Sequence, residues 1–212
     1  MLKSLLSRSL IAGLALSILA PTFATAQTYR MFDPVSRKMV TVDTSKNRRS
    51  GRRSGRTVGK EFHRTIVSFA SPEAPGTVII DSASRHLYFV LPGDLAIRFG
   101  VGVGRDGFRW SGTVRVGRKA EWPTWTPPAE MIRRQPELVK YSGGMAGGPT
   151  NPLGARALYL YDGGRDTMYR IHGTNEPWSI GQNVSSGCLR MVNEDITELH
   201  SLVETGAKVI VY

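Results

Sequence analysis

Short apolar runs separated by turn signals fill the chain from residue 77 to its end. Seven of these runs are rich in β-branched, aromatic and leucine side chains, a composition typical of strands. Pro92-Gly93, after the second run, suits the central pair of a type II turn. Many short strands with few helical stretches predict a mainly β domain, either a sandwich or a barrel. The runs are Thr77–Asp81, Leu87–Leu91, Leu95–Val101, Thr113–Val116, Ala157–Tyr161, Met168–Ile171 and Lys208–Tyr212.

Helical signals occur in only two places. Pro127 suits the first position of a brief helix, and Thr126 is its expected cap. A clearer helix is predicted over residues 194–204, where four apolar residues recur at helical spacing. Asn193 is the expected N-cap of this helix, and Gly206 follows its end.

A glycine pattern, Gly102-x-Gly104-x-x-Gly107, matches the dinucleotide-binding fingerprint. That fingerprint has physical meaning only where it opens a helix whose N-terminus meets a pyrophosphate. The residues that follow lead into another predicted strand instead. We therefore interpret the three glycines as turn residues.

Residues 1–26 have the pattern of a secretory signal peptide. Lys3 and Arg8 precede an apolar stretch over 10–20, and Ala24-Thr25-Ala26 supplies the small residues of a cleavage site. The apolar stretch is shorter than the roughly 20 residues that span a bilayer. We expect cleavage after Ala26 and no transmembrane segment in the mature chain; an uncleaved membrane anchor is the alternative.

Basic residues are concentrated after this segment. The whole chain has a net charge of +11, and residues 46–64 carry eight basic residues against one acidic residue. Such a segment has little to bury, so we predict that residues 27–66 form a polar, Arg-rich disordered extension and 67–212 a folded domain. The extension either contacts an anionic envelope surface or is a solvated spacer. Export argues against nucleic acid as its partner.

The chain has a single cysteine, Cys188. In an exported protein an unpaired cysteine is a buried apolar residue, an intermolecular bridge or a reactive thiol. His172 lies upstream, and an imidazole near a thiol can generate the nucleophilic thiolate. A strand that ends at His172 and a loop that returns to Cys188 could bring the two side chains together.

The residues around Cys188 suit acyl chemistry as well. The amides of Gly187 and Cys188 are candidate donors to the oxyanion of a tetrahedral intermediate. Arg190 could bind a substrate carboxylate through two hydrogen bonds. Ser185 either donates a hydrogen bond near the thiolate or shapes the turn. A zinc site is not expected, because paired Cys/His ligand spacing is absent from the sequence.

These motifs resemble the L,D-transpeptidase (YkuD-type) catalytic domain over about residues 75–212. The signature in that family usually has histidine directly before Gly-Cys, where this chain has Ser186. The residues that carry the resemblance are His172-Gly173-Thr174, Gly181, Ser185–Met191, 147–154, 125–128 and the start of the hairpin over 78–89.

The resemblance implies a mixed β-sandwich with one or two short helices. Cys188 would attack the carbonyl of the third residue of a peptidoglycan tetrapeptide stem and release D-alanine. An amine of another stem would resolve the thioester into a 3→3 cross-link. His172 would act as the base and the Gly173 carbonyl would orient it, while Ser185, Ser186, Gly187 and Arg190 would contact substrate. The resemblance implies no cofactor and no metal, and it points to the periplasm.

The sequence alone leaves several alternatives open. Other acceptors for the same thioester are water, a free D-amino acid or a lysine of an envelope protein. A non-catalytic wall-binding module is a different class of function. Four aromatic residues either line a groove for the stem or pack structurally, and the other three histidines are expected to be structural. These residues are Trp122, Trp125, Trp178 and Tyr141, and His63, His86 and His200.

Overall fold

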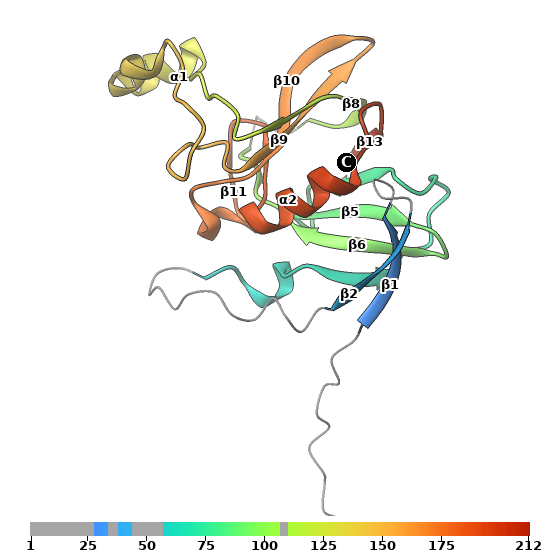
Figure 1. Cartoon of the computed structure of the whole chain (residues 1–212). Helices are drawn as coiled ribbons and strands as arrows, with labels where there is room; N and C mark the ends of the chain where they lie inside the picture. Colours follow the sequence, from blue (N-terminus) through green and yellow to red (C-terminus); the bar gives the residue numbers. More distant parts are fainter. Residues whose placement is uncertain (1–27, 34–37, 44–56, 107–109) are drawn as a thin grey trace, which may run out of the picture.

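The computed structural model describes residues 28–33, 38–43, 57–106 and 110–212 (Figure 1). Within these ranges, strands dominate and helices are short, as predicted. The strands are β1 Thr28–Asp33, β2 Lys38–Asp43, β3 Thr65–Ser68, β4 Val78–Asp81, β5 His86–Leu91, β6 Leu95–Gly100, β7 Val103–Gly104, β8 Gly112–Glu121, β9 Arg156–Asp162, β10 Arg165–His172, β11 Asn183–Ser185, β12 Leu189–Arg190 and β13 Lys208–Val211. The helices are α1 Ala129–Arg134 and α2 Asn193–Leu202, with 3-10 turns η2 Lys60–Phe62, η3 Pro136–Tyr141 and η4 Pro177–Ser179.

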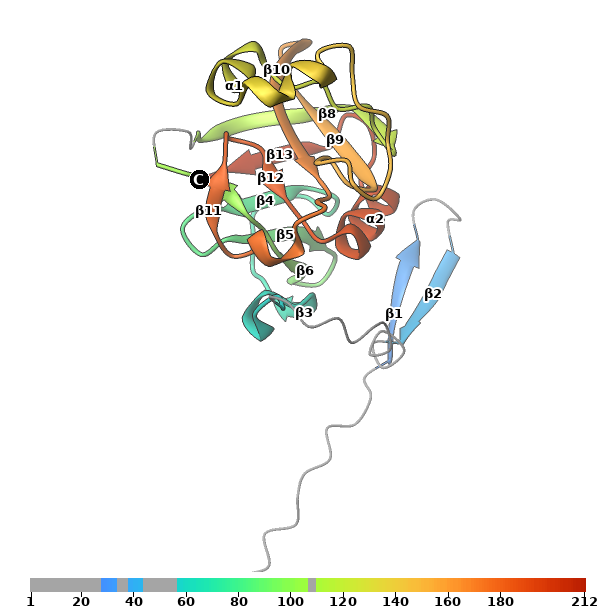
Figure 2. The same cartoon turned by 90° about the vertical axis from the view of Figure 1, so that its left-hand side faces the viewer.

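One mixed sheet contains nine of the strands, in the order β12-β10-β9-β8-β13-β4-β5-β6-β3. The pairs β10/β12 and β13/β4 are parallel, and the other neighbours are antiparallel. Figure 2 shows β8, β9 and β10 above β4, β5 and β6, with α2 at one side. Each of the seven predicted strands coincides with a strand of this sheet. Two further pairs, β7/β11 and β1/β2, form separate small sheets.

In the described residues, a hydrophobic core lies between the two halves of the sheet. Alternate residues of β4 to β6 and of β8 to β10 point into it, as the two-residue repeat of a strand requires. Residues of α2 close one side of the core, where the helix packs against β9. The largest of the fully buried core side chains are Phe99, Ile80, Leu87, Leu158, Leu160, Ile171, Met191, Ile196 and Leu199.

Both predicted helix starts need correction. Thr126 does not cap α1, which begins two residues after Pro127 and has Pro128 as its N-cap. Asn193 is the first residue of α2 and makes no cap, because its side chain binds backbone amides outside the helix.

The boundary predicted at residue 67 is too late. The 3-10 turn η2 and most of β3 lie within the range predicted to be disordered, and so do β1 and β2. Phe62 packs so closely on Gly100 and Gly181 that a Cβ at either glycine would overlap it. Arg64 forms ion pairs with α2, at 3.7 Å from Asp195 and also with Glu198. The high arginine content of the segment concealed these anchoring residues.

The remaining N-terminal predictions lie outside the described residues. These are the signal peptide over 1–26 and the most basic part of the extension, over 44–56. In the described part of the chain, helices are too short and too polar to cross a bilayer.

Gly102 and Gly104 are not the turn residues that we predicted, because both lie in extended, paired backbone. Gly102 forms an isolated bridge with Arg190, and Val103–Gly104 pairs with β11. The next regular element is the strand β8, so no helix follows the pattern in the part of the chain that the structure describes.

Candidate active site

Cys188 and His172 lie on the same side of two adjacent strands. Strand β10 ends at His172, and β12 begins directly after Cys188. The two strands run parallel, with Ile171 opposite Leu189 and His172 opposite Arg190. Ile171 and Leu189 both point into the core. Because successive side chains alternate between faces, His172 and Cys188 both lie on the other side.

His172 is held in one tautomer. The residue is 5% exposed, and Nδ1 lies 2.6 Å from the carbonyl oxygen of Gly173. A carbonyl can only accept, so Nδ1 carries the proton and Nε2 is left unprotonated in the neutral ring. Burial lowers the pKa of His172 to about 4, and the charges of Arg190 and Arg170 also lower it, against the opposing Gly173 hydrogen bond. The imidazole is therefore neutral at neutral pH.

Cys188 is half-buried as a residue. Removal of water by the surrounding protein raises its pKa above the ordinary value. A hydrogen bond from the backbone amide of Arg170 and the charges of Arg170 and Arg190 lower it in part. The sulfur also lies 3.9 Å from the carbonyl oxygen of Met168. At neutral pH the thiol and the imidazole are therefore both uncharged.

Ser185 shapes the turn that precedes the thiol. Its buried hydroxyl donates to the carbonyl of Cys188 and accepts from the amide of Gly187 at 3.1 Å. Gly187 has a φ of 109°, a conformation that favours glycine. Its amide is already bound, whereas the Cys188 amide has no backbone or side-chain acceptor among the described residues. Ser186, which replaces the usual histidine, is exposed.

Arg190 is already paired with a carboxylate. One of its guanidinium nitrogens lies 2.9 Å from an oxygen of Glu176, and Glu176 is the more exposed partner of the two. The arginine therefore has carboxylate-binding geometry on the same side of the sheet as His172.

Asn193 supports the loop that follows His172. Its side-chain oxygen accepts from the amides of Ala155, at 2.9 Å, and Thr174, at 3.3 Å. A Cβ at Gly154 or Gly173 would lie 2.2 Å from that oxygen, so both positions require glycine. The sequence signal at Asn193 was that of a helix cap, and it concealed this role.

Trp110 was also missed. Its indole N–H donates to the carbonyl of Gly187 at 3.3 Å, and its ring stacks on Tyr169 at a centroid distance of 4.6 Å. It stands just after the glycine pattern, and its distance from Cys188 in the sequence gave no signal. Of the predicted aromatic residues, Trp122 and Trp178 are exposed, whereas Trp125 and Tyr141 form a tilted ring pair at 6.2 Å.

The other histidines show no grouping typical of a metal site. His86 contacts the carbonyl of Glu61 at 3.1 Å, and His200 lies in α2. Among the described residues, no three of the side chains His, Cys, Asp and Glu cluster as metal ligands do.

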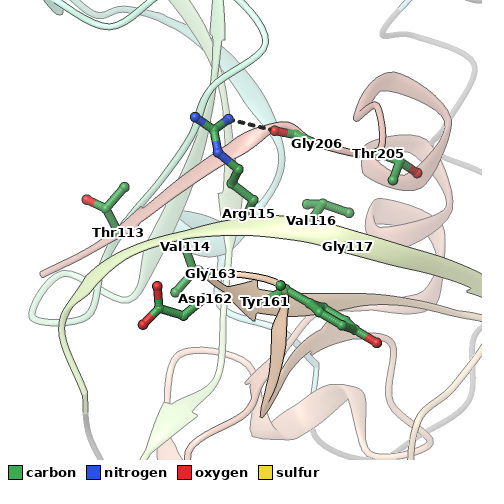
Figure 3. A pocket seen from close by; sticks show the side chains of 11 residues that line it. Thr113, Val114, Arg115, Val116, Gly117, Tyr161, Asp162, Gly163, Thr205 and Gly206 are labelled. Atoms are coloured by element: carbon green, nitrogen blue, oxygen red, sulfur yellow. Dashed lines mark hydrogen bonds between the residues drawn. The ribbon is translucent and has the colours of Figure 1, made fainter.

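A hollow of about 510 Å³ lies elsewhere on the sheet (Figure 3). It is bounded by Thr113–Gly117 of β8, the β9–β10 turn over 161–164, and Thr205-Gly206 before β13. Neither Cys188 nor His172 lines it, so it is separate from the thiol.

Comparison with known proteins places these residues in a family. A family model described as the L,D-transpeptidase catalytic domain matches residues 75–211. The probable L,D-transpeptidase YbiS of Escherichia coli strain K12 is 39% identical over 140 residues, which cover 62% of this chain and 43% of that protein. The probable L,D-transpeptidase ErfK/SrfK of the same strain is 36% identical over 141 residues, covering 62% and 42%. The chain thus spans less than half the length of these relatives.

A solved structure is similar over more of its length. It is titled a probable carnitine operon oxidoreductase from Brucella melitensis and is 44% identical, with a TM-score of 0.51. The match covers 73% of this chain and 96% of that one. Since the family model spans more than half of the chain and includes His172 and Cys188, this chain belongs to the L,D-transpeptidase (YkuD-type) catalytic domain family.

Proposed function

We propose that the protein is an exported peptidoglycan L,D-transpeptidase with Cys188 as nucleophile and His172 as base. The observation that carries the proposal is the parallel register of β10 and β12, which puts both side chains on one side of adjacent strands. The bond between His172 and the Gly173 carbonyl supports it, since it leaves Nε2 ready to accept a proton.

In the first half-reaction, Nε2 of His172 takes the thiol proton while the sulfur attacks the carbonyl carbon of the third stem residue. The amide of Cys188 donates to the oxyanion that forms. The imidazolium then returns its proton to the nitrogen of the departing D-alanine. The products are free D-alanine and a thioester on Cys188.

In the second half-reaction, an amine of another stem attacks the thioester carbonyl. His172 takes a proton from that amine and returns it to the sulfur as the carbon–sulfur bond breaks. One amide bond has replaced another, so the exchange needs no nucleotide. The product is a 3→3 cross-link and the enzyme regains its thiol.

The neutral resting pair favours general-base catalysis over a preformed thiolate. The thiol pKa is raised by burial, and the pKa of His172, about 4, keeps the imidazole free of protons at neutral pH. Proton transfer and sulfur attack are therefore coupled in the same step.

Arg190 is the proposed site for a carboxylate of the stem. Because Glu176 holds the guanidinium at 2.9 Å in the absence of substrate, a stem carboxylate would exchange with a side-chain carboxylate of similar geometry. Ser186, exposed beside Gly187 and Ser185, would line the entry to the thiol.

We propose the periplasm as the site of action and peptidoglycan stem peptides as the partners, consistent with the signal-like N-terminus. The Arg-rich extension would contact an anionic envelope surface. The oxidoreductase title of the Brucella relative does not favour a second function here, because the glycine pattern leads into β8 and opens no helix in the described residues.

The test is a muropeptide assay with mature wild type and Cys188→Ala. Purified tetrapeptide muropeptides should yield cross-linked dimers and free D-alanine with wild type alone, identified by mass. Release of D-alanine without dimers would mean that water or another acceptor, and not the amine of a second stem, resolves the thioester. Products from both proteins at equal rates would contradict it.

A further inference from the structure

Strand β10 is interrupted shortly before His172. Its pairing with β9 shifts register between Asp166 and Arg170, and Met168 in the gap has a φ of 64°. A left-handed conformation is unfavourable for a residue with a side chain. Other interactions must therefore stabilise the backbone conformation of Met168 in this bulge.

The carboxylate of Asp166 closes the bulge. One oxygen accepts from the amide of Met168 at 2.8 Å and from Arg170 at 2.7 Å, and the other accepts from Arg170 at 2.9 Å. Partial burial opposes ionisation, but the hydrogen bonds from Arg170 and Met168 lower the pKa of Asp166 below its ordinary value. Asp166 is therefore ionised at neutral pH. We call the arrangement of Asp166, Arg170 and the Met168 amide the clasp.

The Arg170 side of the clasp is fixed as well. Its side chain is 11% exposed, and its guanidinium carbon lies 4.3 Å from the ring centroid of Tyr159. The guanidinium of Arg118 lies 3.5 Å from the same ring centroid. An arginine bound to both a carboxylate and an aromatic ring has few rotamers left.

The bulge presents two backbone groups to the sulfur of Cys188. The carbonyl of Met168 lies 3.9 Å from the sulfur and can accept from the thiol. The backbone amide of Arg170 also acts on the thiol and lowers its pKa. An ordinary strand would direct these groups into a regular ladder, so the bulge is what makes them available.

We propose that Asp166 is a positioning residue for the thiol: by clasping Arg170 and the Met168 amide, it fixes the bulge whose backbone cradles the sulfur of Cys188. The inference rests on the proposed function in so far as Cys188 is the reacting group. Asp166 itself touches neither the sulfur nor His172 in the structure's hydrogen bonds, and acts through the backbone.

The test measures the thiol directly. Iodoacetamide reacts with the thiolate, forming a carbon–sulfur bond and releasing iodide, so the pH dependence of alkylation reports the pKa of Cys188. In Asp166→Ala, loss of the cradle should move this profile upward by roughly half a pH unit or more, with alkylation about threefold slower below the midpoint. If Asp166 acted through its charge alone, its removal would leave the positive charge of Arg170 unbalanced near the sulfur. The pKa of Cys188 would then fall, and the alkylation profile would move to lower pH.

Two further variants make the result decisive. Asp166→Glu keeps the charge and displaces the carboxylate, so it should also shift the profile upward, whereas a purely electrostatic role predicts no shift. Glu121→Gln is the control, because it removes another strand ion pair, at 3.1 Å from Arg156, that does not contact the bulge. Circular dichroism and melting temperature identify which variants are folded.

The inference is overturned if the pH profile of alkylation in the folded Asp166 variants is unchanged or moves to lower pH. The alkylation assay needs no stem peptide, so its outcome is independent of the proposed function. If wild type makes no peptidoglycan product and the profiles shift as expected, the transpeptidase proposal fails and the positioning role stands. If products form and the alkylation profiles do not shift, the positioning role fails and the transpeptidase proposal stands.

Discussion

At the scale of single residues, the environment of His172 decides how the site would work. Burial and two nearby arginines lower its pKa to about 4, and its Nδ1 is committed to the Gly173 carbonyl. A base of this kind stays unprotonated over the whole neutral and mildly acidic range. Its weakness as a proton acceptor is compensated by the fixed orientation that the Gly173 carbonyl gives to the ring.

The pH dependence of catalysis follows from this environment. The acid limb of kcat/KM should lie near pH 4, because activity is lost only when His172 becomes protonated. Initial rates on a muropeptide donor across acidic buffers would measure it. An acid limb near the ordinary histidine value of about 6.5 would show that the ring is solvated in the working enzyme.

Asn193 offers a second test at this scale. In Asn193→Ala the amides of Ala155 and Thr174 lose their acceptor, and each unsatisfied amide costs about 1–3 kcal/mol. The free energy of unfolding should fall, and kcat should fall with it as the Gly173 carbonyl moves. Asn175→Ala is the matched control, since its side chain makes one exposed bond to Thr150. Equal losses in both variants, measured by urea unfolding and turnover, would contradict the support role.

At the scale of elements, the sequence predicted strands better than it predicted the site. The composition of runs such as Leu87–Leu91 predicts a strand, and β5 has nearly those bounds. The strands β7, β11 and β12 have two or three residues each, too few to show a repeat. The group that lies 3.9 Å from the sulfur is the backbone carbonyl of Met168, which no residue type reveals. Cys188 and His172, the proposed nucleophile and base, could be named from the sequence because thiol and imidazole chemistry depends on side-chain identity.

The docking of η2 and β3 provides a prediction at this scale. Gly181 has a φ of 80°, and a Cβ there would lie 2.1 Å from the Phe62 ring. Gly206 has a φ of 92° and open space around it, so alanine there adds backbone strain alone. Gly181→Ala should therefore lower the free energy of unfolding by more than Gly206→Ala, by about 1–3 kcal/mol.

Thermal or urea unfolding of both variants would measure that difference. Combining Gly181→Ala with Phe62→Ala should be less destabilising than the sum of the two changes, since the overlap is then gone. Strict additivity would mean that the two residues do not contact each other in solution.

At the scale of the whole molecule, two buried groups, His172 and Asp195, make the free energy of unfolding depend on pH in opposite directions. The pKa of His172 is lowered, so its contribution to stability is present above about pH 6.5 and is lost as the pH falls toward 4. Burial raises the pKa of Asp195 to about 6, against the attraction of Arg64. Its contribution is present below its unfolded value of 3.8 and is lost as the pH rises through about 6.

Asp195→Asn isolates the second group. The variant should gain free energy of unfolding relative to wild type as the pH rises from about 4 to 7, because it carries no buried charge at the upper end. Urea unfolding of both proteins at several pH values would measure the gain. A difference that is independent of pH would mean that Arg64 neutralises the carboxylate fully.

The central claim is that the reaction passes through a thioester on Cys188 generated with the help of His172. Its most direct test is the intact mass of the protein after brief exposure to a tetrapeptide donor without an acceptor, followed by peptide mapping. We predict a mass increase equal to the donor minus D-alanine, located on Cys188, absent in Cys188→Ala and formed far more slowly in His172→Gln. Donor turnover with no adduct on Cys188, or an adduct formed at the wild-type rate in His172→Gln, would contradict the account.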